Sequence, residues 1–214
     1  MVRVGWPMGM QFFLEVGAYM VFAVMIGWLG AAALAANQVT LRLMSISFMT
    51  TWGLGVAATT LVGRYIGAGE PAVAAAAGRR TMVLGLVITG ACALLYVGLA
   101  RPLASLFTTD AEVVRLAVML LPIAAVFQVF DGINMVSYGA LRGAGDTRWP
   151  MWAVAAMSWP VGIPLVWALT LPAGLGVRGA WLGTSIMVAG MAALLWTRFQ
   201  RGRWIHTGPV VTAK

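Results

Sequence analysis

Two carboxylate side chains inside long apolar runs are the first sign of chemistry in this chain. The sequence contains six acidic residues, and only Glu15 and Asp131 lie well within such runs. An acid at membrane depth is costly, so these residues are rare and usually mark an ion path, a proton relay or a substrate site. Glu15 and Asp131 are therefore the first candidates for function.

The two acids are expected at the same depth in a membrane. Glu15 follows the start of one apolar run, near residue 7, and Asp131 precedes the end of another, near residue 139, by the same number of residues. A helical rise of about 1.5 Å per residue then puts each acid about 12 Å from one side of the membrane. In a hydrocarbon core about 30 Å thick, both acids lie near the middle.

Polar side chains at helical spacing share the face of each acid. They are Gln11 and Tyr19 beside Glu15, and Gln128, Asn134 and Tyr138 beside Asp131. We expect these five residues to line a cavity with the acids. Their oxygens and the two carboxylates are ligands that Na⁺ could take. The acids could equally share a proton, because two carboxylates close together and away from water resist ionising together.

No Arg or Lys is expected at the depth of this pair. A static salt bridge is therefore not expected, and a bound cation or proton is the predicted counter-charge of Glu15 and Asp131. The structural alternative is a pair of protonated acids hydrogen-bonded within a helical bundle. The cost of keeping two acids in a membrane favours coupling to an ion.

The segments that carry these residues are predicted membrane spans. Of 214 residues, 61% are hydrophobic and 9% are charged, whereas a soluble domain has about 25% charged residues. The apolar runs long enough to cross a bilayer, at roughly 20 residues each, cover about residues 7–29, 41–62, 81–99, 116–139, 151–171 and 179–197. The predicted fold is an all-α integral membrane protein. A single lobe of six transmembrane helices is expected over residues 1–200, followed by a basic cytoplasmic tail over 201–214.

Local signals predict how the spans are joined and bent. Residues 37–38 are expected to form a short external turn, and the Ala-rich residues 72–80 a separate interfacial helix. Pro160 and Pro164 predict kinks or local unwinding of the fifth span. Gly179 and Gly183, at GxxxG spacing, predict close helix packing by the sixth.

The distribution of basic residues predicts the orientation of the chain. With residue 1 inside, the inner loops collect ten of the fourteen Lys and Arg residues, namely Arg3, Arg64, Arg79, Arg80, Arg142, Arg148, Arg198, Arg201, Arg203 and Lys214. The other four are Arg42, Arg101, Arg115 and Arg178. This bias predicts a multi-pass protein of the plasma (inner) membrane with both termini in the cytoplasm. The formal charge of +8 thus sets orientation, and no nucleic-acid partner is expected.

Enzymatic activity is not expected, although one motif suggests it. The run Gly143-Ala144-Gly145-Asp146 resembles the GxGD motif of intramembrane aspartyl proteases, which need two facing aspartates inside the membrane. Asp146 is predicted in a cytoplasmic turn between Arg142 and Arg148, at the wrong depth for that role. The one cysteine, Cys92, has no nearby His and is expected to be a small core residue. No cofactor is predicted beyond a coupling ion.

A series of short motifs, in order over about residues 3–200, resembles the C-terminal half of transporters of the MATE (multidrug and toxic compound extrusion) family. The motifs are Pro7-Met8-Gly9, Phe13-Leu14-Glu15-Val16, the run 29–38 (LGAAALAANQ), Val62-Gly63, Gly67-Ala68-Gly69, Leu106-Phe107-Thr108 with Asp110, the run 139–147 (GALRGAGDT) and Gly176-Val177-Arg178-Gly179-Ala180-Trp181. Their order and number make the resemblance specific.

The resemblance implies a twelve-helix antiporter of two six-helix lobes around a central cleft, which exports cationic amphiphilic drugs in exchange for Na⁺ or H⁺. In the NorM-type branch, a Glu on the seventh helix and an Asp on the tenth form a cation site, and they match Glu15 and Asp131. The tenth helix often has a Tyr where this chain has Phe127, which shifts the expectation toward H⁺. The sequence covers one lobe, so a second lobe is an expected partner, together with the lipid bilayer.

The sequence leaves two alternatives to a drug antiporter open. A lipid-linked sugar exporter of the wider superfamily tends to hold pyrophosphate with basic residues in its cavity. The predicted spans contain acids and only Arg42 near one end, which favours a cationic substrate. The other alternative is a truncated membrane fragment that does not transport.

Overall fold

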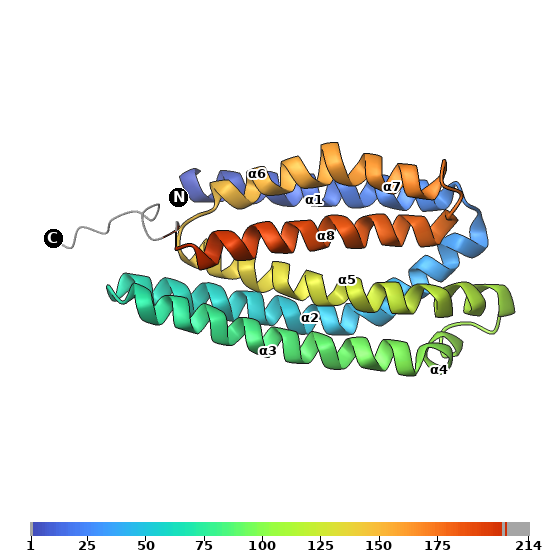
Figure 1. Ribbon diagram of the computed structural model, residues 1–214, viewed down its shortest axis with the longest axis horizontal. Helices are drawn as coiled ribbons and strands as arrows, with labels where there is room; N and C mark the ends of the chain where they lie inside the picture. Colours follow the sequence, from blue (N-terminus) through green and yellow to red (C-terminus); the bar gives the residue numbers. More distant parts are fainter. Residues whose placement is uncertain (1, 203, 205–214) are drawn as a thin grey trace.

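The computed structural model describes residues 2–202 and Trp204. Throughout this range the regular structure is helical. The predicted basic tail over 201–214 lies mostly outside the described residues, so its structure stays a prediction. The first helix begins and the last one ends at the same end of an elongated bundle (Figure 1).

Six stretches of helix are long and apolar enough to span a membrane. They are α1 (Val2–Gly27), α2 (Ala31–Gly67), α3 (Pro71–Gly98), α5 (Ala111–Gly143), the continuous run of α6 (Arg148–Met157), η1 (Ser158–Gly162) and α7 (Ile163–Thr170), and α8 (Gly176–Gln200). A short helix, α4 (Ala100–Ser105), joins α3 to α5. The predicted all-α fold with six candidate spans is confirmed.

The first connection between spans differs from the prediction. The chain turns at residues 28–30, where Gly30 adopts a φ of 101°, and α2 follows directly. The predicted turn residues Asn37 and Gln38 therefore lie on α2. The Asn37 side chain is 1% exposed, and its Oδ1 accepts a hydrogen bond from Trp181 Nε1 at 3.1 Å. This contact with α8 satisfies a polar side chain inside the bundle, where the sequence alone suggested a loop.

The predicted interfacial helix over residues 72–80 is also not a separate element. Pro71 occupies the first turn of α3, and the helix continues without a break to Gly98. Proline at this position loses no helical hydrogen bond, and alanine is the best helix former. The Ala-rich stretch therefore extends the third span instead of turning away from it.

Helix α5 is the centre of the bundle and packs against α2, α3 and α8 (Figure 1). Its contact with α2 is backbone to backbone. A Cβ atom at Gly139 would meet the carbonyl oxygen of Gly55, and one at Gly143 would meet that of Thr59. Glycine at these positions lets the two helices approach closely, as small residues do in membrane proteins.

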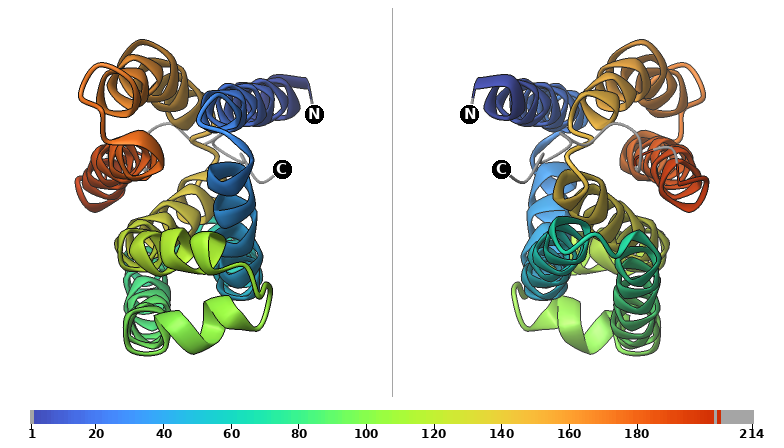
Figure 2. Two further views of the ribbon diagram at one scale, coloured as in Figure 1. Left: turned by 90° about the vertical axis from the view of Figure 1, so that its right-hand side faces the viewer. Right: turned by 90° about the vertical axis from the view of Figure 1, so that its left-hand side faces the viewer.

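Viewed along its length, the bundle has two groups of helices (Figure 2). Helix α1 lies beside the α6–α7 run on one side, and α2, α3 and α5 form the other side. Helix α8 connects them, because it packs against both α5 and α7. The two acids predicted to work together come from opposite groups, α1 and α5.

The fifth span is unwound at Pro160, as predicted, whereas Pro164 lies in the first turn of the regular helix α7. Residues Ser158–Gly162 form a single π-helical turn, η1, between α6 and α7. Proline has no N–H to donate to the helical ladder, and such turns are a common way to absorb the loss. The predicted close packing of the sixth span is confirmed too, because a Cβ at Gly183 would lie 2.9 Å from Val166 Cα on α7.

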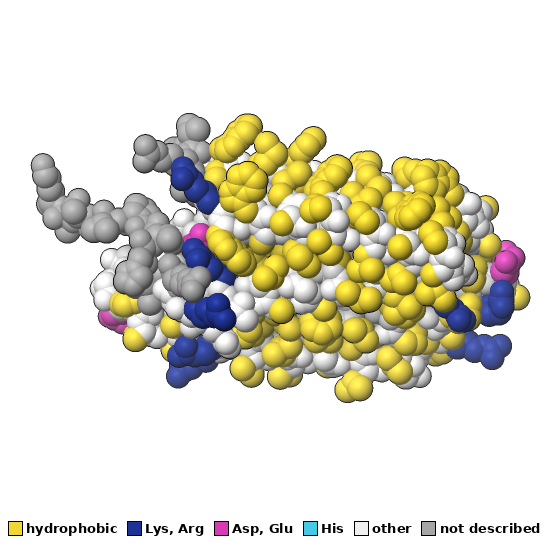
Figure 3. Space-filling model, turned by 45° about the horizontal axis from the view of Figure 1, so that its top comes forward, with side chains coloured by type: hydrophobic (Ala, Val, Ile, Leu, Met, Phe, Trp, Pro, Cys, Tyr) yellow, Lys and Arg dark blue, Asp and Glu magenta, His cyan; other side chains and the backbone are white. Residues whose placement is uncertain are grey.

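The surface matches a protein that spans a membrane. Hydrophobic side chains cover the middle of the molecule, and Lys and Arg side chains gather at its two ends (Figure 3). Large side chains such as Phe13 and Leu94 are 70% and 76% exposed. Exposure of this extent on a six-span helical protein suits contact with lipid.

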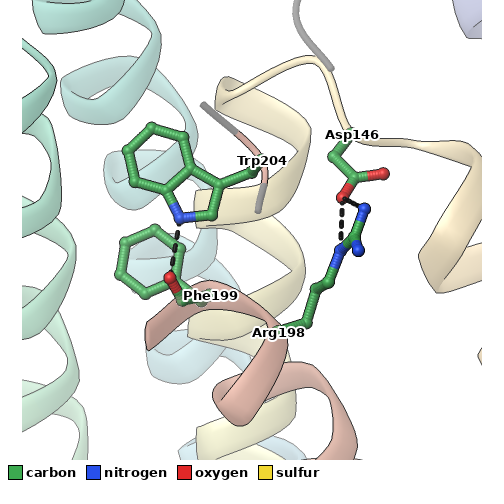
Figure 4. Close-up of polar contacts among 4 residues, drawn as sticks. All are labelled: Asp146, Arg198, Phe199 and Trp204. Atoms are coloured by element: carbon green, nitrogen blue, oxygen red, sulfur yellow. Dashed lines mark hydrogen bonds and ion pairs between the residues drawn. The ribbon is translucent and has the colours of Figure 1, made fainter. Parts of the chain in front are cut away.

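One end of the bundle, where α5 ends and α6 begins, is called the basic end below. Two guanidinium nitrogens of Arg198, Nε and Nη2, each lie 2.9 Å from Asp146 Oδ2 (Figure 4). Arg198 also lies over the Trp149 ring, 5.5 Å from its centroid. Next to it, Trp204 stacks on Phe199 with centroids 5.4 Å apart and donates Nε1–H to the Phe199 carbonyl at 2.7 Å. These contacts join the α5–α6 connection to the end of α8.

Candidate ion and substrate cavity

A cavity of about 660 Å³ lies between the two groups of helices. Its walls come from α1, α2, α5, the α6–α7 run and α8, and most of the lining is apolar. The aromatic side chains of the lining are Phe12, Tyr19, Phe22, Phe48, Trp52, Phe127, Tyr138 and Trp181. A cavity of this size, apolar and with a few polar groups, has the character of a small-molecule site.

Ring contacts hold the part of the aromatic wall around Phe127 of α5. Trp181 meets Phe127 and Phe22 edge to face, with centroids 5.8 and 6.2 Å apart. The hydrogen bond from Trp181 Nε1 to Asn37 also fixes the orientation of the indole. Phe127 thus fills an apolar position in this wall, and it contributes no oxygen near Asp131.

Glu15 and Asp131 line this same cavity, one from α1 and one from α5. Each lies in the middle of its helix, and their charges interact. Glu15 Oε1 accepts a hydrogen bond from Gln11 Nε2 at 2.9 Å, and its carboxylate also interacts with the hydroxyl of Tyr138. The fold therefore brings together two carboxylates that are 116 residues apart in sequence.

Three of the five predicted lining residues, Tyr19, Asn134 and Tyr138, are on the cavity wall. Asn134 donates Nδ2–H to the Val188 carbonyl of α8 at 3.2 Å. Its Oδ1 is buried and has no hydrogen-bond partner among the described residues. An amide oxygen one turn from Asp131 and without a partner is a suitable additional ligand for a cation.

The other two predicted lining residues, Gln11 and Gln128, do not line the cavity. Each is 1% exposed. Gln11 lies one turn before Glu15 and serves it as a hydrogen-bond donor. Gln128 shares the helical face of Asp131, but surrounding side chains cover it, and its Nε2 has no partner in the described part of the chain. Helical spacing identifies a face, and the packing around that face decides which residues reach the cavity.

Arg142 corrects the expectation that no basic group lies near the acids. It occupies the last turn of α5, it lines the cavity, and its charge acts on the carboxylate of Glu15. Its Cζ lies 5.6 Å from the centroid of the Tyr138 ring. A signal for this position is present in the sequence, because Arg142 continues the helical spacing of Asp131, Asn134 and Tyr138 by one more turn.

The cavity can hold a cation with an apolar body. Its lining has two carboxylates and one guanidinium among the described residues, a formal charge of −1 (−2 + 1) when both acids are ionised. No group of three or more His, Cys, Asp or Glu side chains is placed to hold a metal in the described part of the chain. A Na⁺ ion would thus need amide or hydroxyl oxygens in addition to the acids.

Asp146, the acid of the GxGD-like run, does not line the cavity. It forms the ion pair with Arg198 at the basic end, and its side chain is 6% exposed. The neighbours expected to flank it, Arg142 and Arg148, are not its partners: Arg142 faces the cavity, and Arg148 is exposed. The aspartate thus has a structural contact, and it does not face a second acid.

Comparisons with known proteins agree with this architecture. "Multidrug resistance protein NorM" of Burkholderia vietnamiensis is 38% identical over 204 residues, which are 93% of this chain and 44% of the relative. "Probable multidrug resistance protein NorM" of Brucella suis biovar 1 is 37% identical over 216 residues, 99% of this chain and 46% of the relative. The chain therefore spans a little under half the length of these curated relatives.

Solved structures show the same fold. The Vibrio cholerae MATE transporter VcmN in its bent form superposes with a TM-score of 0.86 at 24% identity, covering 94% of this chain and 46% of that one. An outward-facing multidrug resistance MATE family transporter of the MOP superfamily gives a TM-score of 0.87 at 22% identity, over 95% and 45%. The MatE family model matches residues 7–168, most of the chain. This protein belongs to the MatE family.

Proposed function

We propose that this chain is the cation-coupled lobe of an antiporter that exports cationic amphiphilic compounds. The observation that carries the proposal is the pair of acids, Glu15 and Asp131, on the wall of one largely apolar cavity. The carboxylates provide sites for a proton or Na⁺, and the aromatic wall provides a surface for an organic cation. Ion and substrate then compete for the same negative charge, and this competition is what antiport requires.

The chain supplies one of two lobes in this proposal. Its motifs resemble those of the C-terminal half of the family, and it covers 44–46% of the length of its NorM relatives. The partner is a second six-helix lobe that completes the central cleft. We further propose that the basic end faces the cytoplasm in the plasma membrane, because Arg64, Arg79 and Arg80 lie there with the α5–α6 connection and the end of α8.

H⁺ is the favoured coupling ion, and Na⁺ is the alternative. Phe127 contributes no oxygen ligand near Asp131, and no third acid joins the pair among the described residues. A proton needs only one carboxylate, whereas Na⁺ needs several oxygens. Asn134 Oδ1 is the most suitable further ligand if Na⁺ is used.

The test is transport by the chain joined to the N-terminal lobe of a NorM relative in proteoliposomes. Glu15→Gln and Asp131→Asn should each abolish export of a fluorescent organic cation driven by a pH or Na⁺ gradient. Glu70→Gln is the matched control, because Glu70 is exposed in the α2–α3 turn, and it should transport normally. Export that persists in both acid variants would refute the coupling site.

The same assay addresses two other possibilities. A lipid-linked sugar exporter gains some support from Arg142, which supplies one cationic group to the cavity, but the two acids outweigh it. That function predicts flipping of a pyrophosphate-linked lipid and no gradient-driven export of organic cations. A non-transporting fragment predicts neither activity even when the second lobe is supplied.

A further inference from the structure

Arg142 is a charged side chain at the edge of the cavity that forms no salt bridge with any described residue. Its burial is intermediate, and its Nε is buried with no hydrogen-bond acceptor in the described part of the chain. The described residues contain a salt bridge at this end, but it belongs to Arg198 and Asp146, and Arg142 takes no part in it. A buried donor left without an acceptor is costly, so this position requires an explanation.

The surroundings of Arg142 connect it to the acidic pair. The guanidinium rests over the ring of Tyr138, 5.6 Å from Cζ to the centroid. The hydroxyl of the same tyrosine interacts with Glu15, and the charge of Arg142 acts on Glu15 directly. Arg142, Tyr138 and Glu15 thus form a short series from the basic end into the cavity, on α5 and α1. Arginine has a long stem that lets its charged head move by several ångströms while the backbone stays fixed.

We propose that Arg142 is a tethered counter-cation that competes with the transported cation for Glu15. This inference rests on the proposed function. When the cavity holds no external cation, the guanidinium neutralises Glu15. When the external cation occupies Glu15, the Tyr138 ring provides a resting place for the displaced guanidinium through a cation–π contact.

Electrostatics makes the guanidinium and the external cation compete for Glu15. Two cations near one carboxylate in a largely apolar cavity repel each other, and the medium screens this repulsion less than water does. Arg142 therefore lowers the affinity of the lobe for an external cation, and it favours release of that cation. Arg142 acts on the transported cation through its interaction with Glu15. In a lipid-linked sugar exporter, Arg142 would instead bind the anionic substrate directly.

The experiment measures equilibrium binding of tetraphenylphosphonium, a hydrophobic monovalent cation, to the full chain in lipid nanodiscs. Arg142→Gln should tighten binding by roughly fivefold to thirtyfold, which is the effect expected when the probe no longer has to displace one charge that interacts with Glu15 over about 8 Å at an effective dielectric constant of 20–40. Arg142→Lys keeps the charge and should bind as the wild type does. Arg148→Gln removes an exposed arginine from the same end and should change nothing.

A double-mutant cycle separates this role from a structural one. In a Glu15→Gln background, Arg142→Gln should lose most of its effect, because the group for which it competes is gone and only the direct repulsion between Arg142 and the probe remains. The inference is overturned if Arg142→Gln leaves binding unchanged or weakens it, or if the gain is equally large without Glu15. If Arg142→Gln does not fold, Arg142→Met keeps the apolar stem and tests the same loss of charge.

The outcomes also distinguish this inference from the function on which it rests. If Glu15→Gln weakens binding and Arg142→Gln has no effect, the acidic site stands and only the counter-cation is overturned. If the wild type binds no probe, or Glu15→Gln has no effect on binding, the proposed cation site fails and the inference fails with it.

Discussion

The hydrogen bond from Gln11 to Glu15 sets the orientation of the acid on α1. Gln11 is 1% exposed, and its Nε2 lies 2.9 Å from Glu15 Oε1. A hydrogen bond to a charged group contributes about 1.5–3 kcal/mol. Losing this donor disfavours the ionised carboxylate that an organic cation needs. We predict that Gln11→Leu weakens binding of the transported organic cation by about tenfold or more, measured as the concentration of that ion for half-maximal transport by the two-lobe protein.

A suitable control for this substitution is Gln38→Leu. Gln38 is also on a membrane span, but its side chain is exposed and lies outside the cavity. Its replacement should leave the half-maximal ion concentration within about twofold of the wild type, because an exposed glutamine makes no contact with the acids. Equal effects of the two substitutions would show that Gln11 does not act through Glu15.

At the scale of single residues, the sequence predicted the position of a residue along its helix better than it predicted whether the side chain extends into the cavity. Equal distances from the same membrane side predicted that Glu15 and Asp131 share a depth, and the structure has them on one cavity. The sequence did not predict the role of Arg142, because its Cα is in the last turn of α5 and only the side chain extends to the cavity. It also could not show that Gln128 is covered, since that depends on neighbouring helices.

At the scale of helices, the contact between α2 and α5 depends on glycine. A Cβ at Gly139 would collide with the backbone carbonyl of Gly55, and a backbone atom cannot move aside as a flexible side chain can. Alanine normally favours a helix by about 1 kcal/mol over glycine, but overpacking costs about 1–3 kcal/mol. We predict that Gly139→Ala lowers the melting temperature of the purified chain by several degrees.

Gly53→Ala provides the comparison for this prediction on helix α2. An added Cβ at Gly53 would meet no atom within 4 Å, so only the helix propensity changes. The melting temperature should stay the same or rise slightly. A fall of the same size in both variants would mean that any glycine replacement weakens these spans and that the α2–α5 contact is not special.

The boundaries of the helices could be predicted only where a local signal decides them. Pro160 predicted the unwound turn, because proline has no N–H to donate to the helical ladder. Pro122 lacks the same donor, yet α5 continues through it, so the surroundings also contribute. The prediction of a turn at residues 37–38 rests on their polarity, and it is wrong. In the folded chain Trp181, which is 144 residues away, supplies a hydrogen-bond donor to Asn37. A long-range contact of this kind leaves no trace in the local sequence.

At the scale of the whole molecule, composition and charge predicted the class of protein. They did not predict which side chains hold the helices together at the ends of the bundle. An apolar surface and basic ends follow from 61% hydrophobic residues and the loop positions of arginine. The closure of the basic end depends on Asp146 and Arg198, which meet across the α5–α6 connection and α8. This pair is 52 residues apart and could not be inferred from spacing.

Removing Arg198 should destabilise the basic end more than removing the charge of its partner Asp146. The Asp146 side chain is 6% exposed and that of Arg198 is 16% exposed, and Arg198 also rests on the Trp149 ring. An unpaired buried charge costs about 3–5 kcal/mol, so Arg198→Gln should approach this cost by stranding Asp146. Asp146→Asn should cost less, about 1–2 kcal/mol, because the guanidinium keeps its aromatic contact and some water. The melting temperature of purified Arg198→Gln should therefore be lower than that of Asp146→Asn. The double variant should lose less stability than the sum of the losses in the two single variants. The reverse order would show that Asp146 is solvated and that the ion pair does not close this end.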